Sequence, residues 1–265
     1  MDYCSIASGS SGNCTFAGTD KTSILIDVGI AGKRIEQGLH MLERTPEELD
    51  GILVTHEHID HIKSIGMLSR KYGIPIYGTR GTLNYILGCS SMGRLDPTLF
   101  HVIREDERFR IGDLEVLPFH ISHDAAQPVG YRLSDGKSTF AVATDMGSYD
   151  EYTIEHLSGL DGLLLESNHD VNMLEVGPYP YPLKRRILGE YGHMSNELAG
   201  QLLGEILHDG LKSILLGHLS KENNYEALAY ATVTSEITLG ENPYRGEDFD
   251  IAVASREHPS QCYHI

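Results

Sequence analysis

The chain has 265 residues, of which 40% are hydrophobic and 22% are charged. These values are ordinary for a soluble globular protein, and they favour one α/β domain spanning residues 1–265. The formal net charge of −17 argues against a broad duplex-binding face, because such a face needs an excess of basic side chains to displace counterions from phosphate.

The sequence shows no targeting, membrane or disulfide signal. Its first residues lack a basic start followed by a long apolar run, and no later segment is apolar enough to cross a bilayer. The four cysteines are dispersed without a Cys-x-x-Cys pair, which favours reduced thiols over a disulfide framework or a sulfur-rich zinc site. We therefore expect a cytoplasmic protein with no membrane partner.

Apolar periodicity predicts alternating strands and helices in the first part of the chain. The expected strands are 3–7, 14–17, 22–28, 51–54 and 74–77, and the expected helices are 31–43, 62–72 and 81–87. The short runs 100–103, 107–111, 114–119, 129–133 and 139–143 then predict the strands of a second sheet.

The remaining chain alternates in the same way. Strands are expected from Leu163 and from Ser213, a helix after an N-cap at Ser195, a helix over 223–239 and a last strand over 249–254. His258 and His264 fall in a polar tail without the spacing of metal ligands.

The stretch Thr55-His56-Glu57-His58-Ile59-Asp60-His61 concentrates ionisable side chains on the turn between a buried strand and a helix. His56 and His58, two residues apart on an extended segment, point the same way and can bind one ion. Asp60 and His61, where the helix begins, can bind a second ion. Imidazole and carboxylate ligands favour Zn²⁺, with Mn²⁺ or Fe²⁺ as competitors. The alternative is a solvated polar turn, which such a density of charge beside an apolar strand disfavours.

This Thr-His-x-His-x-Asp-His pattern resembles the signature of the metallo-β-lactamase superfamily. The resemblance implies a four-layer αββα sandwich with a dinuclear metal site at one edge. It also implies that Asp27 supports the metal turn from beneath, where a role behind the ligands is favoured over ligation.

The resemblance extends to later strand ends. It assigns the third histidine of metal 1 to His123 and a carboxylate bridging both metals to Asp145. His120 competes with His123, but it closes its strand and is expected to face away, as a core or supporting histidine. His218 also follows a strand, and it joins Asp60 and His61 on metal 2.

His193 and Glu166 match the positions at which the phosphodiesterase branch of the superfamily, including tRNase Z, places a histidine at the scissile phosphate and its glutamate partner. Three stretches, 8–13, 165–170 and 217–224, resemble the YycJ/WalJ-like group, which implies a 5′-to-3′ DNA exonuclease. Cys14 departs from the serine common in that group. The contacts expected with the substrate are made by Ser11, Asn13, His169 and Ser195.

Two of these substrate signals have plain alternatives. The Ser- and Gly-rich loop 8–13 can offer donors to an anion, yet by itself it reads as a simple turn. The basic run Lys184-Arg185-Arg186 lies beside a Pro- and Tyr-rich stretch and can line a phosphate path with stacking tyrosines, although a charge run is more often a solvated helix face.

Together these residues predict a two-metal phosphodiesterase acting on nucleic acid, DNA in preference to RNA. A hydroxide bridging the two metals would be the nucleophile, and Asp60 can orient it. Only 22 positions separate His123 from Asp145 (145 − 123), too few for the protruding arm of tRNase Z. The alternatives are a hydrolase of β-lactams, lactones or thioesters using the same metals, and a metal-binding regulatory protein without catalysis.

Overall fold

The structure, a computed structural model, describes all residues 1–265, and the chain divides into two compact units. Unit 1 comprises Met1–His120, Ala125–Lys137 and Ser255–His264. Unit 2 comprises Ile121–Asp124 and Ser138–Ala254, together with Ile265. None of the helices combines the length and the apolar composition that crossing a bilayer requires. The expectation of a single domain over 1–265 stays a prediction.

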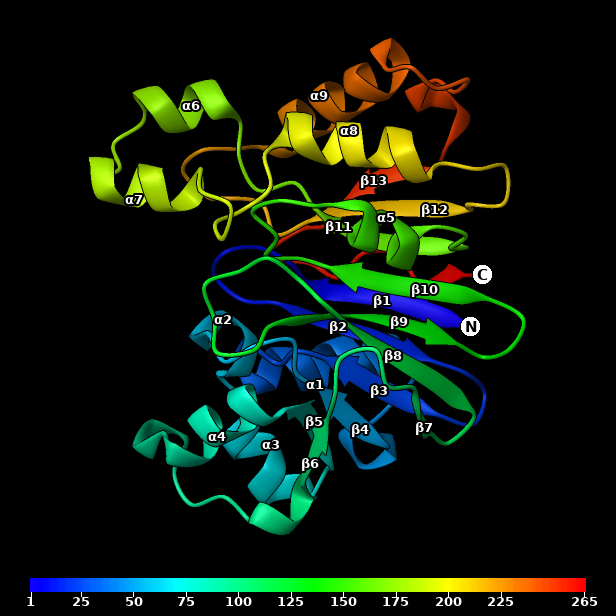
Figure 1. Ribbon diagram of the computed structural model, residues 1–265. Coiled ribbons are helices and arrows are strands. Elements are labelled where there is room, and N and C mark those ends of the chain that lie inside the picture. Colours follow the sequence, from blue (N-terminus) through cyan, green and yellow to red (C-terminus); the bar gives the residue numbers. More distant parts are fainter. The chain divides into compact units, whose positions relative to one another are not determined.

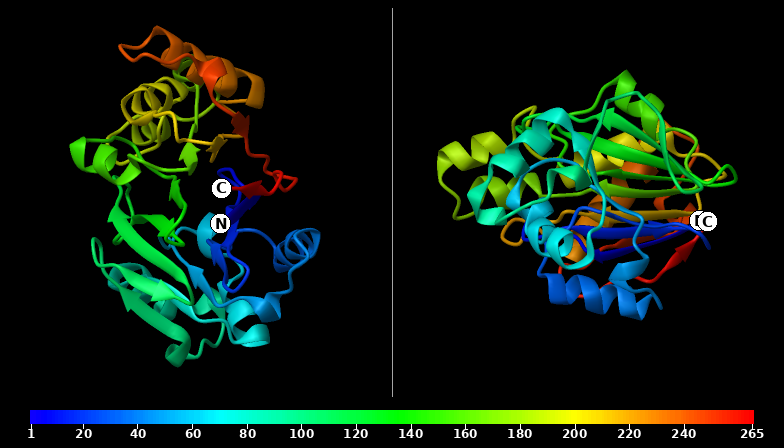
Figure 2. Two further views of the ribbon diagram at one scale, coloured as in Figure 1. Left: turned by 90° about the vertical axis from the view of Figure 1, so that its right-hand side faces the viewer. Right: turned by 90° about the horizontal axis from the view of Figure 1, so that it is seen from below.

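Unit 1 contains a complete seven-stranded mixed sheet in the order β14-β1-β2-β3-β4-β5-β6 (Figures 1 and 2). From β3 onward the strands run parallel to one another. The strands are β1 (Asp2–Ala7), β2 (Cys14–Gly18), β3 (Ser23–Ile26), β4 (Gly51–Leu53), β5 (Ile76–Thr79), β6 (Phe100–Ile103) and β14 (Tyr263–His264).

The helices of unit 1 lie between these strands in the sequence and pack on their sheet through apolar stripes. They are α1 (Gly32–Met41), α2 (Ile59–Ile62), α3 (Ile65–Tyr72) and α4 (Arg80–Gly88). Side chains spaced three or four apart, such as Ile35 and Leu39 of α1 and Ile65 and Leu68 of α3, are buried against Leu25, Ile52 and Ile76 of the strands. This packing fixes the carboxyl ends of β3 and β4, where the His-rich turn begins.

The second seven-stranded sheet has the order β13-β12-β11-β10-β9-β8-β7. Its antiparallel strands β7 (Phe109–Ile111), β8 (Leu114–His120) and β9 (Val129–Ser134) belong to unit 1. Its parallel strands β10 (Thr139–Ala143), β11 (Gly162–Glu166), β12 (Ser213–Gly217) and β13 (Ile251–Val253) belong to unit 2. All residues of β11 and β12 are buried, as expected of central parallel strands covered on both faces.

Five helices belong to unit 2, namely α5 (Glu151–Leu157), α6 (Val171–Val176), α7 (Tyr181–Ile187), α8 (Asn196–Ile206) and α9 (Glu226–Leu239). Ser195 caps α8 by accepting a hydrogen bond from the Leu198 N–H, which confirms the predicted N-cap. Figure 1 shows α8 and α9 side by side over β12 and β13, and α6 and α7 as a pair of short helices projecting from the unit. Two seven-stranded sheets flanked by helices confirm the predicted αββα class.

Three sequence expectations are corrected. Residues 100–103, assigned to the second sheet, form β6, which pairs with β5 in the first. The C-terminal tail contains β14, which pairs with β1 in the register Asp2 to His264. Helices α5, α6 and α7 were not expected, because each is at most seven residues long and buries few side chains.

Candidate metal centre

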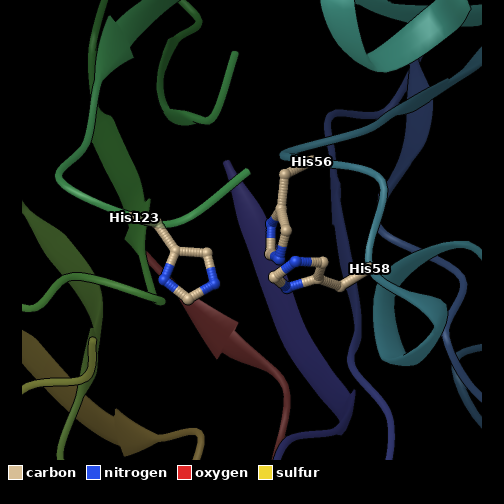
Figure 3. Close-up of side chains that lie close together, drawn as sticks. All are labelled: His56, His58 and His123. Carbon is tan, nitrogen blue, oxygen red and sulfur yellow. The ribbon is translucent and has the colours of Figure 1, made fainter. Parts of the chain in front are cut away.

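The His-rich turn of unit 1 leaves β4 at Val54 and enters α2 at Ile59. The side chains of His56 and His61 are fully buried, and their ring centroids lie 4.1 Å apart. The rings of His56 and His58 meet edge to face at 4.6 Å (Figure 3). His61 Nε2 lies 3.5 Å from Asp60 Oδ2. Three imidazoles and a carboxylate therefore gather on one turn.

Asp27, at the end of β3, holds this turn in place from below. Its Oδ1 accepts a hydrogen bond from the Thr55 N–H at 2.9 Å, and its Oδ2 accepts one from the Thr55 hydroxyl at 2.8 Å. Oδ2 also lies 2.8 Å from His61 Nδ1. A carboxylate on Nδ1 fixes the ring and directs Nε2 toward a metal, so these contacts suit a supporting carboxylate better than a ligand.

Backbone hydrogen bonds join the turn to the segments that precede β2 and follow β3. Asn13 and Val28 donate their N–H groups to the carbonyls of Asp60 and His61, each at 2.8 Å. A Cβ added to Gly29 would lie 1.6 Å from the Asp60 carbonyl oxygen, so only glycine fits there. The Asn13 side chain closes the 8–13 loop by accepting from the Gly9 N–H, and its Nδ2 lies 3.2 Å from His61 Nε2. Ser11 is exposed on the same loop.

Glu57, the other acid of the motif, has a structural role. Its carboxylate accepts hydrogen bonds from the Ala126 N–H at 2.7 Å and from the Thr82 hydroxyl at 3.3 Å. These bonds tie the turn to α4 and to the 125–127 segment of the same unit.

Unit 2 gathers its polar side chains where its chain leaves the strands. His123 follows β8 in the sequence, whereas Asp145, Glu166 and His218 stand at or just after the ends of the parallel strands β10, β11 and β12. Asp145 Oδ1 lies 3.5 Å from His218 Nε2 and 3.7 Å from His123 Nε2. These separations are too long for hydrogen bonds and suit atoms that share a metal ion.

The candidate ligands His123 and His218 of unit 2 each have Nδ1 directed at a protein oxygen. His123 Nδ1 lies 3.0 Å from the Gly192 carbonyl oxygen, and His218 Nδ1 lies 3.0 Å from Glu166 Oε1. Such partners hold the proton on Nδ1 and leave Nε2 as the ligand atom. Asn168 supports His218 further by donating to its carbonyl oxygen at 2.8 Å.

Glu166 is fully buried and is the common partner of two histidines. Its Oε1 lies 2.8 Å from His193 Nδ1 as well as 3.0 Å from His218 Nδ1. Its Oε2 accepts hydrogen bonds from the Met146 and Met194 N–H groups. Burial alone would raise the pKa of Glu166, but the charge and hydrogen bond of His193, together with those of His218, lower that pKa to about 2. Glu166 is therefore an anion at neutral pH.

Other predicted site residues have different surroundings. His120 is half exposed and lies 3.8 Å from Glu105, so the expectation of a core histidine there is wrong, whereas the alternative of a supporting histidine stays a prediction. His169 is buried, and neither ring nitrogen has a hydrogen-bond partner. Burial lowers the pKa of His169 to about 4. Ser195 uses its hydroxyl as the cap of α8.

Sequence reasoning did not find the supporting contacts of Asn168 and Thr55, nor that Glu166 contacts two histidines at once. Asn168 had a detectable signal, because it follows a buried apolar strand within the Glu166–Asp170 polar run. Two of the three basic residues at 184–186 have protein partners. Lys184 donates to the carbonyls of Glu175 and Gly177, and Arg186 pairs with Asp124.

The donor set fits divalent cations. In unit 2, Asp145, Glu166, His193 and His218 form one group of ligand atoms within 4.8 Å of one another, and unit 1 contributes imidazoles and a carboxylate from a single turn. Neutral imidazoles and carboxylates, without thiolates, are the ligands of hydrolytic zinc and manganese sites.

Comparison with known proteins defines the class to which this fold and site belong. The model of the beta-lactamase superfamily domain matches residues 22–213, and the chain is a member of that superfamily. The metallo-beta-lactamase fold protein YhfI from Bacillus subtilis superposes with a TM-score of 0.69 at 19% identity, covering 98% of both chains.

Two curated relatives are similar over nearly the whole chain. Exodeoxyribonuclease WalJ of Streptococcus pneumoniae is 39% identical over 235 residues, which cover 89% of this chain and 87% of the relative. Exodeoxyribonuclease YycJ of Bacillus anthracis is 36% identical over 265 residues, which cover 100% and 99%. The chain is thus a superfamily member homologous to exodeoxyribonucleases, as its motifs predicted.

Proposed function

We propose that this protein is a metal-dependent 5′-to-3′ exonuclease that hydrolyses the phosphodiester bonds of DNA. The observation that carries the proposal is the pair of histidines on Glu166 Oε1. One of them, His218, is a candidate metal ligand, and the other, His193, is a candidate for proton transfer. That both relatives are exodeoxyribonucleases supports DNA as the substrate.

We assign seven ligands to two ions. His56, His58 and His123, the residues labelled in Figure 3, would hold the first ion. Asp60, His61 and His218 would hold the second, and Asp145 would be a ligand of both. The assignment is supported by the Nδ1 partners of His61, His123 and His218, each of which presents Nε2 as the ligand atom. Zn²⁺ suits this set best, with Mn²⁺ or Fe²⁺ as alternatives.

Divalent ions bound there supply Lewis acidity toward the phosphate and a water nucleophile at neutral pH. The protein itself supplies orientation and a proton. Glu166, ionised and buried, orients His193 through Nδ1, and we assign His193 Nε2 as the proton donor to the leaving oxygen. The His193 side chain is 18% exposed, which lets it reach a substrate while its anchor stays buried.

The remaining roles follow the same geometry. Asp60, adjacent to His61 on the turn, can orient the attacking water as well as bind metal. Asn13, next to His61 Nε2, and His169, with two buried unpaired nitrogens, are proposed substrate contacts. Ser11 and Ser195 complete the proposed set; the Ser195 hydroxyl accepts from the Leu198 N–H and still has its own hydrogen to donate.

Assays of the metal-loaded protein on several substrates test this function. We expect release of mononucleotides from the 5′ end of 5′-phosphorylated DNA, with slower turnover of RNA and complete loss after treatment with a chelator. Single and double strands labelled at either end establish the polarity. Turnover of nitrocefin alone would favour a β-lactam, lactone or thioester hydrolase, and no turnover at all would favour a metal-binding regulatory protein.

A further inference from the structure

The loop 189–192 of unit 2, directly before His193, is fastened by its backbone. The carbonyl oxygen of Glu190 accepts hydrogen bonds from the hydroxyls of Ser122 and Ser148, at 2.8 and 3.1 Å. The Tyr191 carbonyl accepts from the Asp124 N–H at 3.1 Å, and the Gly192 carbonyl lies 3.0 Å from His123 Nδ1. Three consecutive carbonyls are therefore bound to the segments that carry the candidate ligands His123 and Asp145.

Glycine contacts make the loop still less adjustable. A Cβ added to Gly147 would lie 2.4 Å from the Gly192 nitrogen, and one added to Gly192 would lie 2.2 Å from the Ile187 carbonyl oxygen. The backbone of Tyr191 thus has a fixed position between two close approaches.

The Tyr191 side chain is nevertheless 61% exposed. A large aromatic ring usually loses most of its exposed area on folding, and here a rigid backbone holds one in solvent instead. Tyr191 is two residues from His193, so their Cα atoms lie within about 7 Å of each other. The backbone that carries the ring therefore lies beside His193, within a tyrosine's reach of the proposed site of phosphate chemistry.

Helix α7, which leads into this loop, carries a second exposed tyrosine and an exposed cation. Tyr181 is 72% exposed, and Arg185 lies four residues further on the same helix face. Lys184 and Arg186 on either side are engaged with carbonyls and with Asp124, which leaves Arg185 as the outward cation of the basic run. Figure 1 shows α7 projecting from the strands of its unit.

We propose that Tyr191, Tyr181 and Arg185, here called the α7 platform, bind the single-stranded end of the nucleic acid. The ring of Tyr191 stacks on the nucleobase next to the scissile phosphate. Tyr181 stacks on a base further along the strand, and Arg185 pairs with the phosphate backbone between them. Exposed aromatic rings with a neighbouring cation are the means by which proteins hold single strands without reading their sequence. This inference deepens the proposed exonuclease function and rests on it.

The test removes the ring and the base separately. The metal-loaded wild type and Tyr191→Ala are compared on a 5′-phosphorylated single strand and on the same strand with abasic residues at its 5′ end. We expect Tyr191→Ala to lower kcat/KM on the ordinary strand by a factor between about 5 and about 150, mainly through KM, which is the range that stacking of one base contributes. The kcat/KM of the wild type should fall by a similar factor on the abasic strand. The kcat/KM of Tyr191→Ala on the abasic strand should be little lower than that.

Two controls and three results decide the outcome. Tyr191→Phe keeps the ring and should restore most of the loss, and Tyr230→Ala removes a 44% exposed tyrosine from α9 instead. Metal content and thermal unfolding show whether each variant is folded. If the losses from removing the ring and from removing the base multiply, the two do not stack on each other. That result, or a Tyr191→Ala effect no larger than that of Tyr230→Ala, would overturn the α7 platform but leave the proposed exonuclease function standing. Failure of the wild type to degrade any DNA would overturn the proposed function and the α7 platform with it.

Discussion

Glu166 shows how a buried charge can be stabilised in the interior of this protein. An isolated carboxylate at such a depth would be protonated, because burial strongly disfavours the charged form. Here two imidazoles and two backbone N–H groups surround it, and its pKa is lowered to about 2 instead. The group can therefore orient His193 and His218 throughout the neutral range.

Replacing His193 with alanine tests the division between proton transfer and metal binding. The variant should lose about 10²- to 10⁴-fold in kcat on DNA, the usual contribution of a general acid, while both metal ions are retained. Steady-state kinetics and metal analysis measure the two quantities on the same preparation. His258→Ala, on an exposed histidine, is the matched control. Parallel loss of metal in His193→Ala would show that His193 is a ligand and not the proton donor.

His169 predicts a pH dependence of stability. Burial lowers the pKa of His169 in the folded protein to about 4, whereas the unfolded chain takes up that proton near pH 6.5. The unfolded state therefore binds more protons between these values, and the free energy of unfolding falls as the pH drops from 6.5 to about 4. This group contributes a slope of up to about 1.4 kcal/mol per pH unit.

Urea denaturation of metal-free wild type and His169→Gln across this range measures the effect. The variant, which cannot take up the proton, should lose less stability than wild type as the pH falls. Equal slopes for the two proteins would rule out a buried neutral imidazole at this position.

Spacing and the superfamily resemblance together predicted the candidate ligands and the support from Asp27, but not the other supporting contacts. The alternation in His56-x-His58 and the strand-end positions of Asp145 and His218 are visible in sequence, because a strand turns a local pattern into a shared direction. The bond from Glu166 to His218 joins residues 52 positions apart, and no local pattern encodes such a distance. Sequence reasoning also missed the exposure of the His120 side chain, because exposure depends on tertiary packing that no local pattern encodes.

Among the elements, the strand ends of the site share an unusual backbone conformation. Asp27, Asp145 and His218 have positive φ values of 59°, 63° and 54°, in the left-handed region that favours glycine. Each such residue costs about 1–3 kcal/mol and persists only where its surroundings fix it. The sharp turn lets a strand stop and aim its next side chain at the edge of the sheet.

A substitution at Gly29 tests whether the metal-binding turn needs its close contact with the segment after β3. Gly29→Ala would place a methyl group against the Asp60 carbonyl and displace the turn, so we expect weaker metal binding and a loss of about 1–3 kcal/mol in stability. Metal titration and thermal unfolding measure both. Gly88→Ala is the control, because its Cβ would meet no heavy atom within 4 Å. A Gly29→Ala protein with wild-type metal affinity would show that the turn can shift without consequence.

The elements that sequence predicted best are those that bury a regular apolar pattern. Strands β10 to β12 and helix α8 were expected within two or three residues of their observed bounds. Helix α6 buries only Leu174 and α7 only Ile187, so neither shows a hydrophobic period. Strand β6 is an edge strand with two exposed residues, and its sheet depends on pairing with β5, which spacing alone cannot specify.

At the scale of the whole molecule, the net charge of −17 has to be reconciled with a polyanionic substrate. Two divalent ions would restore about four positive charges at the site alone. Binding should then depend on local metal contacts and a few cations such as Arg185, not on a basic surface.

The salt dependence of DNA binding tests this view. With two or three phosphate contacts, log Kobs for a single strand should fall with log salt with a slope of about −2 or shallower. Fluorescence anisotropy at several salt concentrations, with Ca²⁺ replacing the catalytic ions to suppress turnover, measures the slope. A steep slope, such as that of a protein neutralising six or more phosphates, would contradict it.

The fold class was predictable because one seven-residue motif identified the superfamily, and the αββα arrangement followed from that resemblance rather than from strand counting. The division into two compact units was not, since it depends on which distant segments pack together: residues 255–264 belong with the N-terminal unit.

Anomalous diffraction from crystals of the metal-loaded protein would locate the proposed ions and the side chains that bind them. We expect two anomalous peaks, the first bound by His56, His58 and His123 and the second by Asp60, His61 and His218, with Asp145 reaching both at about 2.0–2.2 Å. A single peak, or two peaks with His123, Asp145 or His218 outside coordination distance, would contradict it.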